Sequence, residues 1–250
     1  MARIRTPFTG VGNIIRFNWH FYILAIASII LLYFVLGQWS DATDKLIYIA
    51  IALISLTTII SLAVSWYVYD LSSMYRLDWL KLAAGNILNI HAGFDETSQL
   101  IADKFPGSNL SVCDFYDPAK HTEVSIKRAR NAYPQFPGTV HIDTGKLPFA
   151  NGYGNAICLI FAAHEIRDEG ERVAFFKELA RALSAGSEII VTEHLRDTAN
   201  FLAYNIGFLH FYSRATWLYT FHAAGLNVKK QIKITPFITT FVLCKNDIAA

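Results

Sequence analysis

Two long uncharged segments lie near the beginning of the chain. No Asp, Glu, Lys or Arg occurs from Phe17 to Ser40 or from Leu46 to Tyr69, and each segment is 24 residues long. At about 1.5 Å per residue, a helix of that length reaches about 36 Å, more than the roughly 30 Å hydrocarbon core of a bilayer. Soluble cores rarely contain such runs. The pattern therefore predicts two transmembrane helices, over about residues 17–39 and 46–69.

The residues beside these segments orient the predicted hairpin. Three arginines precede the first segment, whereas the loop Gln38–Lys45 carries two acids and one lysine. Positive charge favours the cytoplasmic side of a membrane. We therefore expect an integral membrane protein with both termini and the whole chain after residue 69 in the cytoplasm. A signal peptide would not be followed, after only five residues, by a second apolar run of the same length.

After residue 70 the pattern changes to short apolar runs that alternate with amphipathic stretches. This alternation is typical of an α/β domain with a mostly parallel sheet. We therefore predict a membrane anchor over 1–69 and a cytoplasmic domain over 70–250. The expected strands are 86–90, 110–113, 139–142, 156–161, 188–192, 227–234 and 237–244, the last two as an antiparallel pair. The expected helices are 70–84, 96–105, 122–132, 172–183 and 201–224.

Composition narrows the classes of function. Cys113, Cys158 and Cys244 are scattered and form neither a disulfide framework nor a zinc motif, and no His-Glu-x-x-His pattern occurs, so we expect no metal. The chain carries 22 basic and 20 acidic side chains, and residues 70–250 hold equal numbers of both. Because this domain has no basic excess, we expect no nucleic-acid partner. The lipid bilayer is the expected neighbour.

Four short motifs follow one another after residue 86. Residues 87–95 read ILNIHAGFD, Asp114 ends the second expected strand, residues 143–149 read DTGKLPF, and residues 159–166 read LIFAAHEI. In order and spacing these motifs resemble class I S-adenosylmethionine-dependent methyltransferases over about residues 75–246. The resemblance implies a Rossmann-like methyltransferase fold, with a mostly parallel seven-stranded sheet and a terminal antiparallel strand.

The resemblance also implies a site for S-adenosylmethionine. In such sheets ligands bind beyond the carboxyl ends of the strands, where Gly93 lets the backbone approach closely. Asp114 would accept hydrogen bonds from the ribose hydroxyls. Asp143, with Thr144 beside it, would face the adenine amino group, and Phe115 would pack against the adenine. Taken as single residues, these also suit turns, loops or the core.

The glycine-rich turn departs from the family pattern. Asn89 replaces an acid, and His91 and Asp95 replace glycines, so that Gly93 alone remains. Asp95 either meets the ammonium group of the ligand or caps the following helix. His91 is either a structural histidine or a base. All four are candidate cofactor-binding residues.

Two acid–base pairs end neighbouring expected strands. His164-Glu165 ends the fourth strand and Glu193-His194 ends the fifth, while His210 lies in the aromatic segment that, by resemblance, covers the acceptor. A histidine with a pKa near 6.5 can deprotonate an acceptor hydroxyl within hydrogen-bond reach. The alternative is that these groups fix loops or pair with neighbouring arginines. The candidate catalytic residues are His164, Glu165, His194 and His210.

Together these features predict a membrane-anchored methyltransferase that acts on a hydrophobic acceptor such as a quinone or a phenolic lipid. Confinement to a membrane is useful only if the acceptor is also there. Two alternatives stay open: non-methyl chemistry with the same cofactor, and a non-catalytic membrane module for binding or assembly. We also expect residues 70–250 to fold and bind the cofactor without the anchor.

Overall fold

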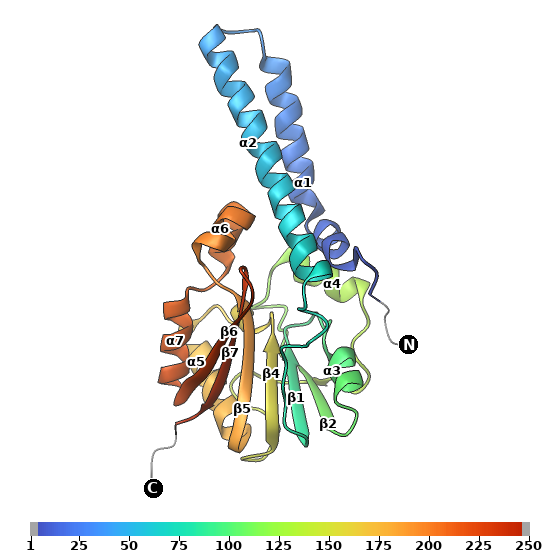
Figure 1. Cartoon of the computed structure of the whole chain (residues 1–250), viewed down its shortest axis with the longest axis vertical. Helices are drawn as coiled ribbons and strands as arrows, with labels where there is room; N and C mark the ends of the chain where they lie inside the picture. The colour runs from blue at the N-terminus through green and yellow to red at the C-terminus, as the bar shows by residue number, and fades with distance from the viewer. Residues whose placement is uncertain (1–4, 247–250) are drawn as a thin grey trace.

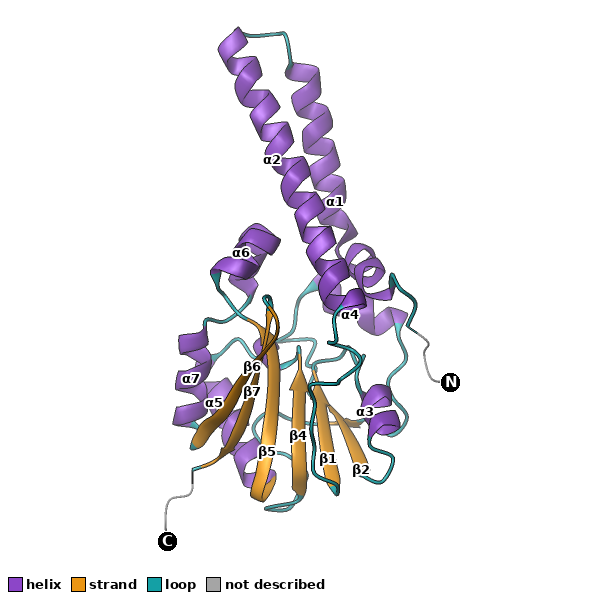
Figure 2. Ribbon diagram, viewed as in Figure 1, coloured by secondary structure: helices purple, strands orange, loops and turns teal. Residues whose placement is uncertain are grey.

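A computed structural model describes residues 5–246, and the chain ends, including Arg3, lie outside the described residues. One mixed sheet forms the centre of the domain, and a helical hairpin extends from it (Figures 1 and 2). The strand order is β3-β2-β1-β4-β5-β7-β6, and β7 alone runs antiparallel to both of its neighbours. The strands are β1 Asn86–His91, β2 Asn109–Asp114, β3 Val140–His141, β4 Gly154–Ile160, β5 Leu183–His194, β6 Leu226–Thr235 and β7 Ile238–Lys245. The predicted fold class is therefore confirmed.

Alternating apolar residues along the strands give the sheet two buried faces. Leu88 and Ile90 point to one core together with α5 (Glu169–Ala182) and α7 (Arg214–Ala223). Ile87 points to the other core, with α3 (Ser98–Lys104) and apolar side chains that precede β1. Successive strand residues face opposite sides of a sheet. Burial of each large apolar side chain stabilises the folded state by about 1.5–3 kcal/mol. A sheet that is covered on both faces is therefore a stable support for the loops at its edge.

The register brings the carboxyl ends of the parallel strands to one edge. His91 at the end of β1 pairs with Asp114 at the end of β2, and Asp114 pairs with His141 of β3. Helix α4 (Val124–Ala132) follows β2, and the 3-10 turn η2 (Ala163–Glu165) follows β4. The predicted site residues lie at or just beyond this edge, which is the side of the domain that faces the hairpin in Figure 1.

The hairpin consists of α1 (Thr9–Val35) and α2 (Asp41–Trp66), and a π-helical turn η1 (Tyr67–Leu71) follows it. Both helices are long and apolar enough to cross a membrane, and almost nothing of their apolar windows is buried by the rest of the chain. They therefore do not form the core of the domain. Helix α1 begins earlier than expected, and its kink at Asn18 separates a foot from the projecting part. The Asn18 amide donates to the Ile14 carbonyl at 3.1 Å, a local bond that competes with helix geometry.

The foot of the hairpin is bonded to the domain. The Asp70 carboxylate accepts from the backbone N–H groups of Gly10 and Val11, at 2.6 and 2.8 Å, and so satisfies free donors in the first turn of α1. Arg5 forms an ion pair with Glu96 at 2.9 Å. Phe17 packs edge-on against Phe94, with ring centroids 5.6 Å apart. Both domain partners, Phe94 and Glu96, lie in the loop after β1, so the anchor contacts the predicted cofactor turn directly.

Two expected helices are wrong as drawn from the sequence. Residues 72–84 form turns and extended chain instead of a helix, because side chains take over the backbone groups: the Ser72 hydroxyl donates to the Val68 carbonyl and accepts from Met74 N–H. The apolar residues that suggested the helix are instead buried against the sheet. The segment 201–224 is broken into α6 (Thr198–Tyr204), the 3-10 helix η3 (Asn205–His210) and α7.

Candidate active site

A large pocket lies at the ends of β2 and β3. It has a volume of about 530 Å³ and is lined by Phe115, Tyr116, Asp143 and Thr144, among others. Phe115 is buried and also contacts Phe175 in the core. The Thr144 hydroxyl donates to Glu171 at 2.5 Å, whereas Asp143 accepts from Gly145 N–H at 2.6 Å. The structure therefore brings three of the predicted adenine-site residues to one cavity.

Asp114 is buried at the end of β2, with 1% of its surface exposed, and its oxygens already have partners. Oδ2 accepts from Arg130 Nη1 at 2.5 Å and from the Gln135 amide at 2.9 Å, and Oδ1 accepts from Tyr116 N–H at 2.9 Å. The Arg130 guanidinium also stacks over the Tyr116 ring, 4.3 Å from its centroid. The carboxylate is thus compensated by a cation that itself lines the large pocket.

The turn after β1 is held by its own side chains. The buried Asn89 amide donates to the hydroxyls of Thr97 and Ser98 at 3.0 and 2.8 Å. Asp95 Oδ1 accepts from Thr97 N–H and Ser98 N–H, so this carboxylate caps the start of α3. Gly93 has φ +93°, a conformation that favours glycine, and a Cβ at Gly93 would collide with Arg130.

His91 supplies an unpartnered donor in this turn. Its Nδ1 accepts from Gly93 N–H at 3.1 Å, so the neutral ring carries its proton on Nε2. Within residues 5–246 no partner reaches this buried Nε2. Burial lowers the pKa of His91, which keeps the ring neutral. The residue lines a second pocket of about 100 Å³, together with Ala92, Glu96 and Phe161.

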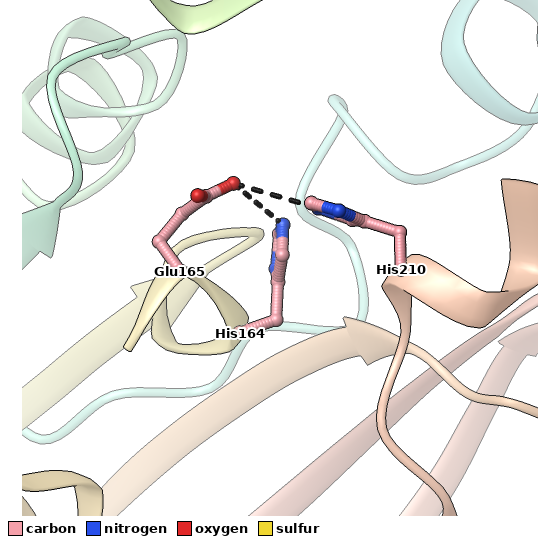
Figure 3. A group of neighbouring side chains, drawn as sticks. All are labelled: His164, Glu165 and His210. Atoms are coloured by element: carbon pink, nitrogen blue, oxygen red, sulfur yellow. Dashed lines mark ion pairs between the residues drawn. The ribbon is translucent and has the colours of Figure 1, made fainter. Parts of the chain in front are cut away.

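An ionisable cluster lies at the ends of β4 and β5, and Figure 3 shows three of its members, His164, Glu165 and His210. His164 Nδ1 lies 2.7 Å from Glu193 Oε2, and His164 Nε2 lies 3.1 Å from Glu165 Oε1. Burial alone would lower the pKa of His164, but the two carboxylates outweigh it and raise the pKa to about 10. Burial would likewise raise the pKa of Glu165, whereas hydrogen bonds from His164 and His210 hold it well below its usual range. Glu165 also lines the small pocket, so the cluster and the β1 turn share a wall.

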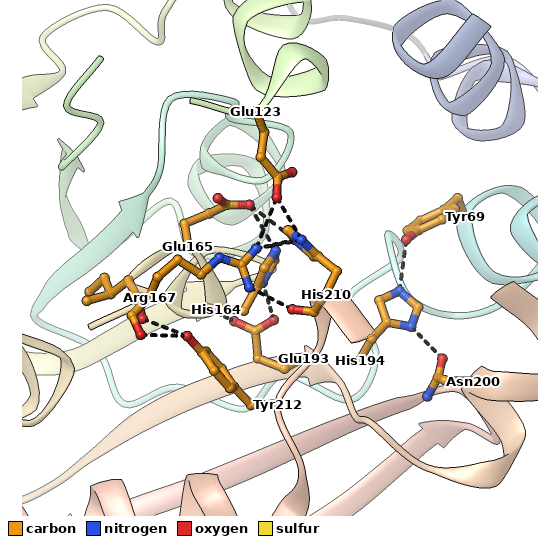
Figure 4. A network of polar contacts seen from close by, with 11 residues as sticks. Tyr69, Glu123, His164, Glu165, Arg167, Glu193, His194, Asn200, His210 and Tyr212 are labelled. Atoms are coloured by element: carbon orange, nitrogen blue, oxygen red, sulfur yellow. Dashed lines mark hydrogen bonds and ion pairs between the residues drawn. The ribbon is translucent and has the colours of Figure 1, made fainter. Parts of the chain in front are cut away.

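His210 joins this cluster from the end of η3 (Figure 4). Its Nε2 lies 3.6 Å from Glu165 Oε1, and its Nδ1 lies 2.7 Å from Glu123 Oε1, which precedes α4. Arg167 contacts the same glutamate at 3.1 Å and the His210 ring at 2.5 and 2.8 Å. Three carboxylates therefore surround two histidines and one arginine.

The donor atoms of His164, Glu165 and His210 lie close enough together to hold a metal ion. However, Arg167 Nη2 lies 2.5 Å from His210 Nδ1 and 2.8 Å from His210 Nε2, and one of these two nitrogens would have to bind the ion. A guanidinium at that distance repels a cation. We therefore retain the expectation of metal-independent chemistry, which a chelator titration of the turnover rate tests.

His194 lies apart from the cluster, although it ends the same strand as Glu193. Its ring nitrogens lie 2.8 Å from the Tyr69 hydroxyl and 3.1 Å from the Asn200 amide oxygen (Figure 4). The ring is stacked between Phe161 and Phe211. Burial lowers the pKa of His194 to about 4, so the ring is neutral. In this structure it connects the end of the hairpin to α6.

The sequence placed most of these groups at one edge but missed several partners. Arg130 and Gln135 of the Asp114 site and Glu123 of the His210 site were not identified as site residues. The one available signal was that 122–132 is a basic helix after the second strand. That pattern indicates positive charge near the cofactor edge without naming the residue that reaches Asp114.

Comparisons with known proteins agree with the fold. No protein-family model matches the sequence, and no curated protein matches it. A solved S-adenosylmethionine-dependent methyltransferase from Aquifex aeolicus is similar with a TM-score of 0.51 and 14% identity, over 75% of this chain and 97% of that one. The mitomycin 7-O-methyltransferase MmcR is similar with a TM-score of 0.52 and 14% identity, over 97% of this chain and 74% of that one.

A third similar structure contains ligands. The O-methyltransferase NcsB1 from neocarzinostatin biosynthesis, solved with S-adenosyl-L-homocysteine and 1,4-dihydroxy-2-naphthoic acid, has a TM-score of 0.50 and 17% identity, over 84% of this chain and 62% of that one. At these identities the likeness concerns the fold. The chain has the Rossmann-like fold of class I methyltransferases, with two apolar helices before it.

Proposed function

We propose that this protein transfers a methyl group from S-adenosylmethionine to a hydroxyl group of a hydrophobic acceptor that resides in the membrane. The observation that carries the proposal is the position of Glu165. This residue lines the small pocket beside His91 and also contacts His164, so a candidate donor site directly adjoins an acid–base cluster. Close alignment of donor and acceptor is the main requirement of methyl transfer.

The residues at the strand ends fit the cofactor. The large pocket, with Phe115, Asp143 and Thr144 in its lining, suits the adenosine part, and Asp114 is a charged acceptor for ribose hydroxyls once Arg130 moves aside. The free His91 Nε2–H can donate to the ligand carboxylate. When bound, the cofactor supplies an electrophilic methyl group. The turn of Asn89, His91, Gly93 and Asp95 would thus serve in place of a glycine-rich turn, with Asn89 and Asp95 shaping the loop.

His164 is the proposed general base. Glu193 fixes the ring through Nδ1, leaves Nε2 directed at Glu165, and would stabilise the imidazolium after proton uptake. Glu165 and Glu193 keep the free ring protonated up to about pH 10. Before His164 can accept the proton of an acceptor hydroxyl, its Nε2 proton must therefore leave, either to Glu165 as the acceptor displaces that carboxylate or to solvent as the pH rises. Glu165 and His210 are the groups that meet the entering acceptor.

Acceptor class and location follow from the hairpin. Its exposed apolar helices favour a membrane compound such as a quinol or a phenolic lipid. NcsB1 was solved with a dihydroxylated aromatic acid, which is compatible with an aromatic hydroxyl acceptor here. We further propose that the domain faces the cytoplasm. Protease added outside intact cells should leave the domain uncleaved, and its removal would overturn this orientation.

Two measurements on the full chain in lipid vesicles test the function. Calorimetry with S-adenosylmethionine should detect binding, and a labelled methyl group should appear in the lipid extract. Absence of binding would favour a non-catalytic membrane module. Binding with transfer of another part of the cofactor would favour non-methyl chemistry. Comparison of lipids from cells with and without the protein, by mass spectrometry, would then identify the acceptor.

A further inference from the structure

The segment of α6 and η3 exposes apolar side chains that the fold does not use. No Asp, Glu, Lys or Arg occurs from Thr198 to Ser213. Ile206 is 81% exposed and Leu202 is 64% exposed, and Phe201 and Leu209 are also exposed. Four large apolar side chains exposed within one short uncharged segment indicate contact with another apolar phase.

The position of this segment indicates which phase that is. Helix α6 lies beside α2, on the side of the domain from which the hairpin extends (Figure 1). Two contacts fix it there: Tyr204 packs on the His194 ring at 5.5 Å, and His194 contacts the Tyr69 hydroxyl at the end of the second uncharged segment. A bilayer around the hairpin would therefore begin at the level of α6.

The opposite flank supports the same boundary. Arg128 of α4 donates to the Phe17 carbonyl at 2.6 Å and lies over the Trp19 ring, 4.9 Å from its centroid, next to the kink of α1. Lys127 on the same helix is exposed. Arginine, lysine and tryptophan at the end of an apolar helix are typical of a membrane–water interface. The hairpin is thus flanked by a basic helix on one side and an uncharged apolar segment on the other.

We propose that residues 198–210 insert shallowly into the bilayer as a second membrane contact, and that the acceptor passes along this segment to the cluster. The apolar side chains Phe201, Leu202, Ile206 and Leu209 would lie among the lipids. The segment ends at His210, which contacts Glu165 and Glu123. It therefore connects the bilayer surface to the proposed base. The acceptor path rests on the proposed function, whereas the membrane insertion does not.

Membrane insertion is tested with a fluorescent label on the full chain in phosphatidylcholine vesicles. Cys113 and Cys158 are buried, so Cys244→Ser followed by Ile206→Cys gives one reactive site. Tyr219→Cys on the exposed surface of α7 is the matched control. Nitroxide groups on the lipid chains should quench the label at 206 several-fold more than the label at 219. Equal quenching of the two labels by the lipid nitroxides would overturn the proposal. So would a label at 206 that the lipids do not quench and that only a protein partner or a second copy of the chain shields from solvent.

The acceptor path is tested with the double substitution Leu202→Gln and Ile206→Gln, against Tyr219→Gln. All three side chains are exposed, so folding should be unaffected. The KM for a long-chain acceptor in vesicles should rise at least tenfold, while kcat on a short soluble analogue and the Kd for S-adenosylmethionine stay unchanged. An unchanged KM would overturn the path. Loss of cofactor binding in the unmodified protein would instead overturn the proposed function and leave the labelling result intact.

Discussion

The two halves of the strand edge treat their charged groups differently. At β1 and β2 the chain itself supplies partners for the Asn89 amide nitrogen, which donates to two hydroxyls, and for Asp114, which accepts from Arg130 and Gln135. Within residues 5–246, His91 Nε2 and Asn89 Oδ1 have none. At β4 and β5 the buried carboxylates Glu165 and Glu193 converge on one histidine. The first half must therefore exchange an internal partner for a ligand, whereas the second half already holds a proton between its groups.

This difference assigns separate roles to the two halves. The ends of β1, β2 and β3 form the cofactor half. A buried carboxylate without a partner costs several kcal/mol, so Arg130 stabilises Asp114 in the ligand-free protein, and the ligand must replace Arg130 when it binds. The ends of β4 and β5 form the acceptor half. There the raised pKa of His164 keeps its ring protonated, and an arriving acceptor can shift that proton to a neighbouring carboxylate. Binding and chemistry should therefore respond to different substitutions.

The largest expected effect is on the chemistry. His164→Gln removes the proposed base, and turnover should fall by about 10²- to 10⁴-fold, the usual contribution of a general base. The Kd for S-adenosylmethionine should not change, because His164 does not line either pocket. His222→Gln, at an exposed position on α7, is the control. Full turnover in folded His164→Gln protein would remove this residue from the mechanism.

The next effect is on binding. Asp114→Ala leaves the ribose hydroxyls without a charged partner, at about 1.5–3 kcal/mol per charged hydrogen bond lost, so the Kd should rise by about 10- to 150-fold. Calorimetry measures this, with exposed Asp103→Ala as the control. If affinity is unchanged in a folded variant, Asp114 is a structural partner of Arg130 alone. Turnover at saturating cofactor should be much less affected.

The features that the sequence predicts are those that neighbouring residues along the chain encode. The two apolar helices, the succession of strands along the chain and the positions of Asp114 and His164 could be predicted, because each is encoded by local hydropathy or by the end of an apolar run. The sheet architecture was implied only by the family resemblance. The 70–84 helix was wrong because Ser72 competes for the backbone, a side-chain effect that periodicity does not register. The contacts of Asp114 with Arg130 and of His210 with Glu123 depend on tertiary structure, and no local pattern encodes them.

The hairpin foot also changes an expectation about the anchor. The sequence predicts that residues 70–250 bind the cofactor without the anchor. However, Arg5 and Asn13 of the anchor both donate hydrogen bonds to Glu96, which lines the small pocket. Phe17 packs on Phe94 in the same loop. Deletion of residues 1–69 would expose buried apolar surface and release this loop. Loss of activity on soluble and membrane acceptors alike is therefore now the expected result of that deletion.

A smaller effect concerns pH. The neutral form of His164 increases as the pH rises toward about 10, so kcat/KM should rise through the alkaline range. Glu165→Gln removes one charge that raises this pKa, so the rise should move to lower pH, and a profile that does not move would contradict the role of Glu165. The ion pairs of His164 also stabilise the folded protein. This stabilisation is complete below the unfolded-state pKa of about 6.5 and is lost as the pH rises through the folded-state pKa of about 10.

The smallest effect tests the exchange at Asp114. Arg130→Ala removes the cation that occupies Asp114 and crowds Gly93, so the ribose no longer competes with it. The ligand-free protein should melt at a lower temperature, because the buried carboxylate keeps only Gln135 and Tyr116 N–H as partners. S-adenosylmethionine should bind a few-fold more tightly, since it then restores partners to the carboxylate. Lys127→Ala, at an exposed position on the same helix, should change neither quantity. Weaker binding in Arg130→Ala would mean that the guanidinium holds the ligand itself, and the cofactor half would then be as preorganised as the acceptor half.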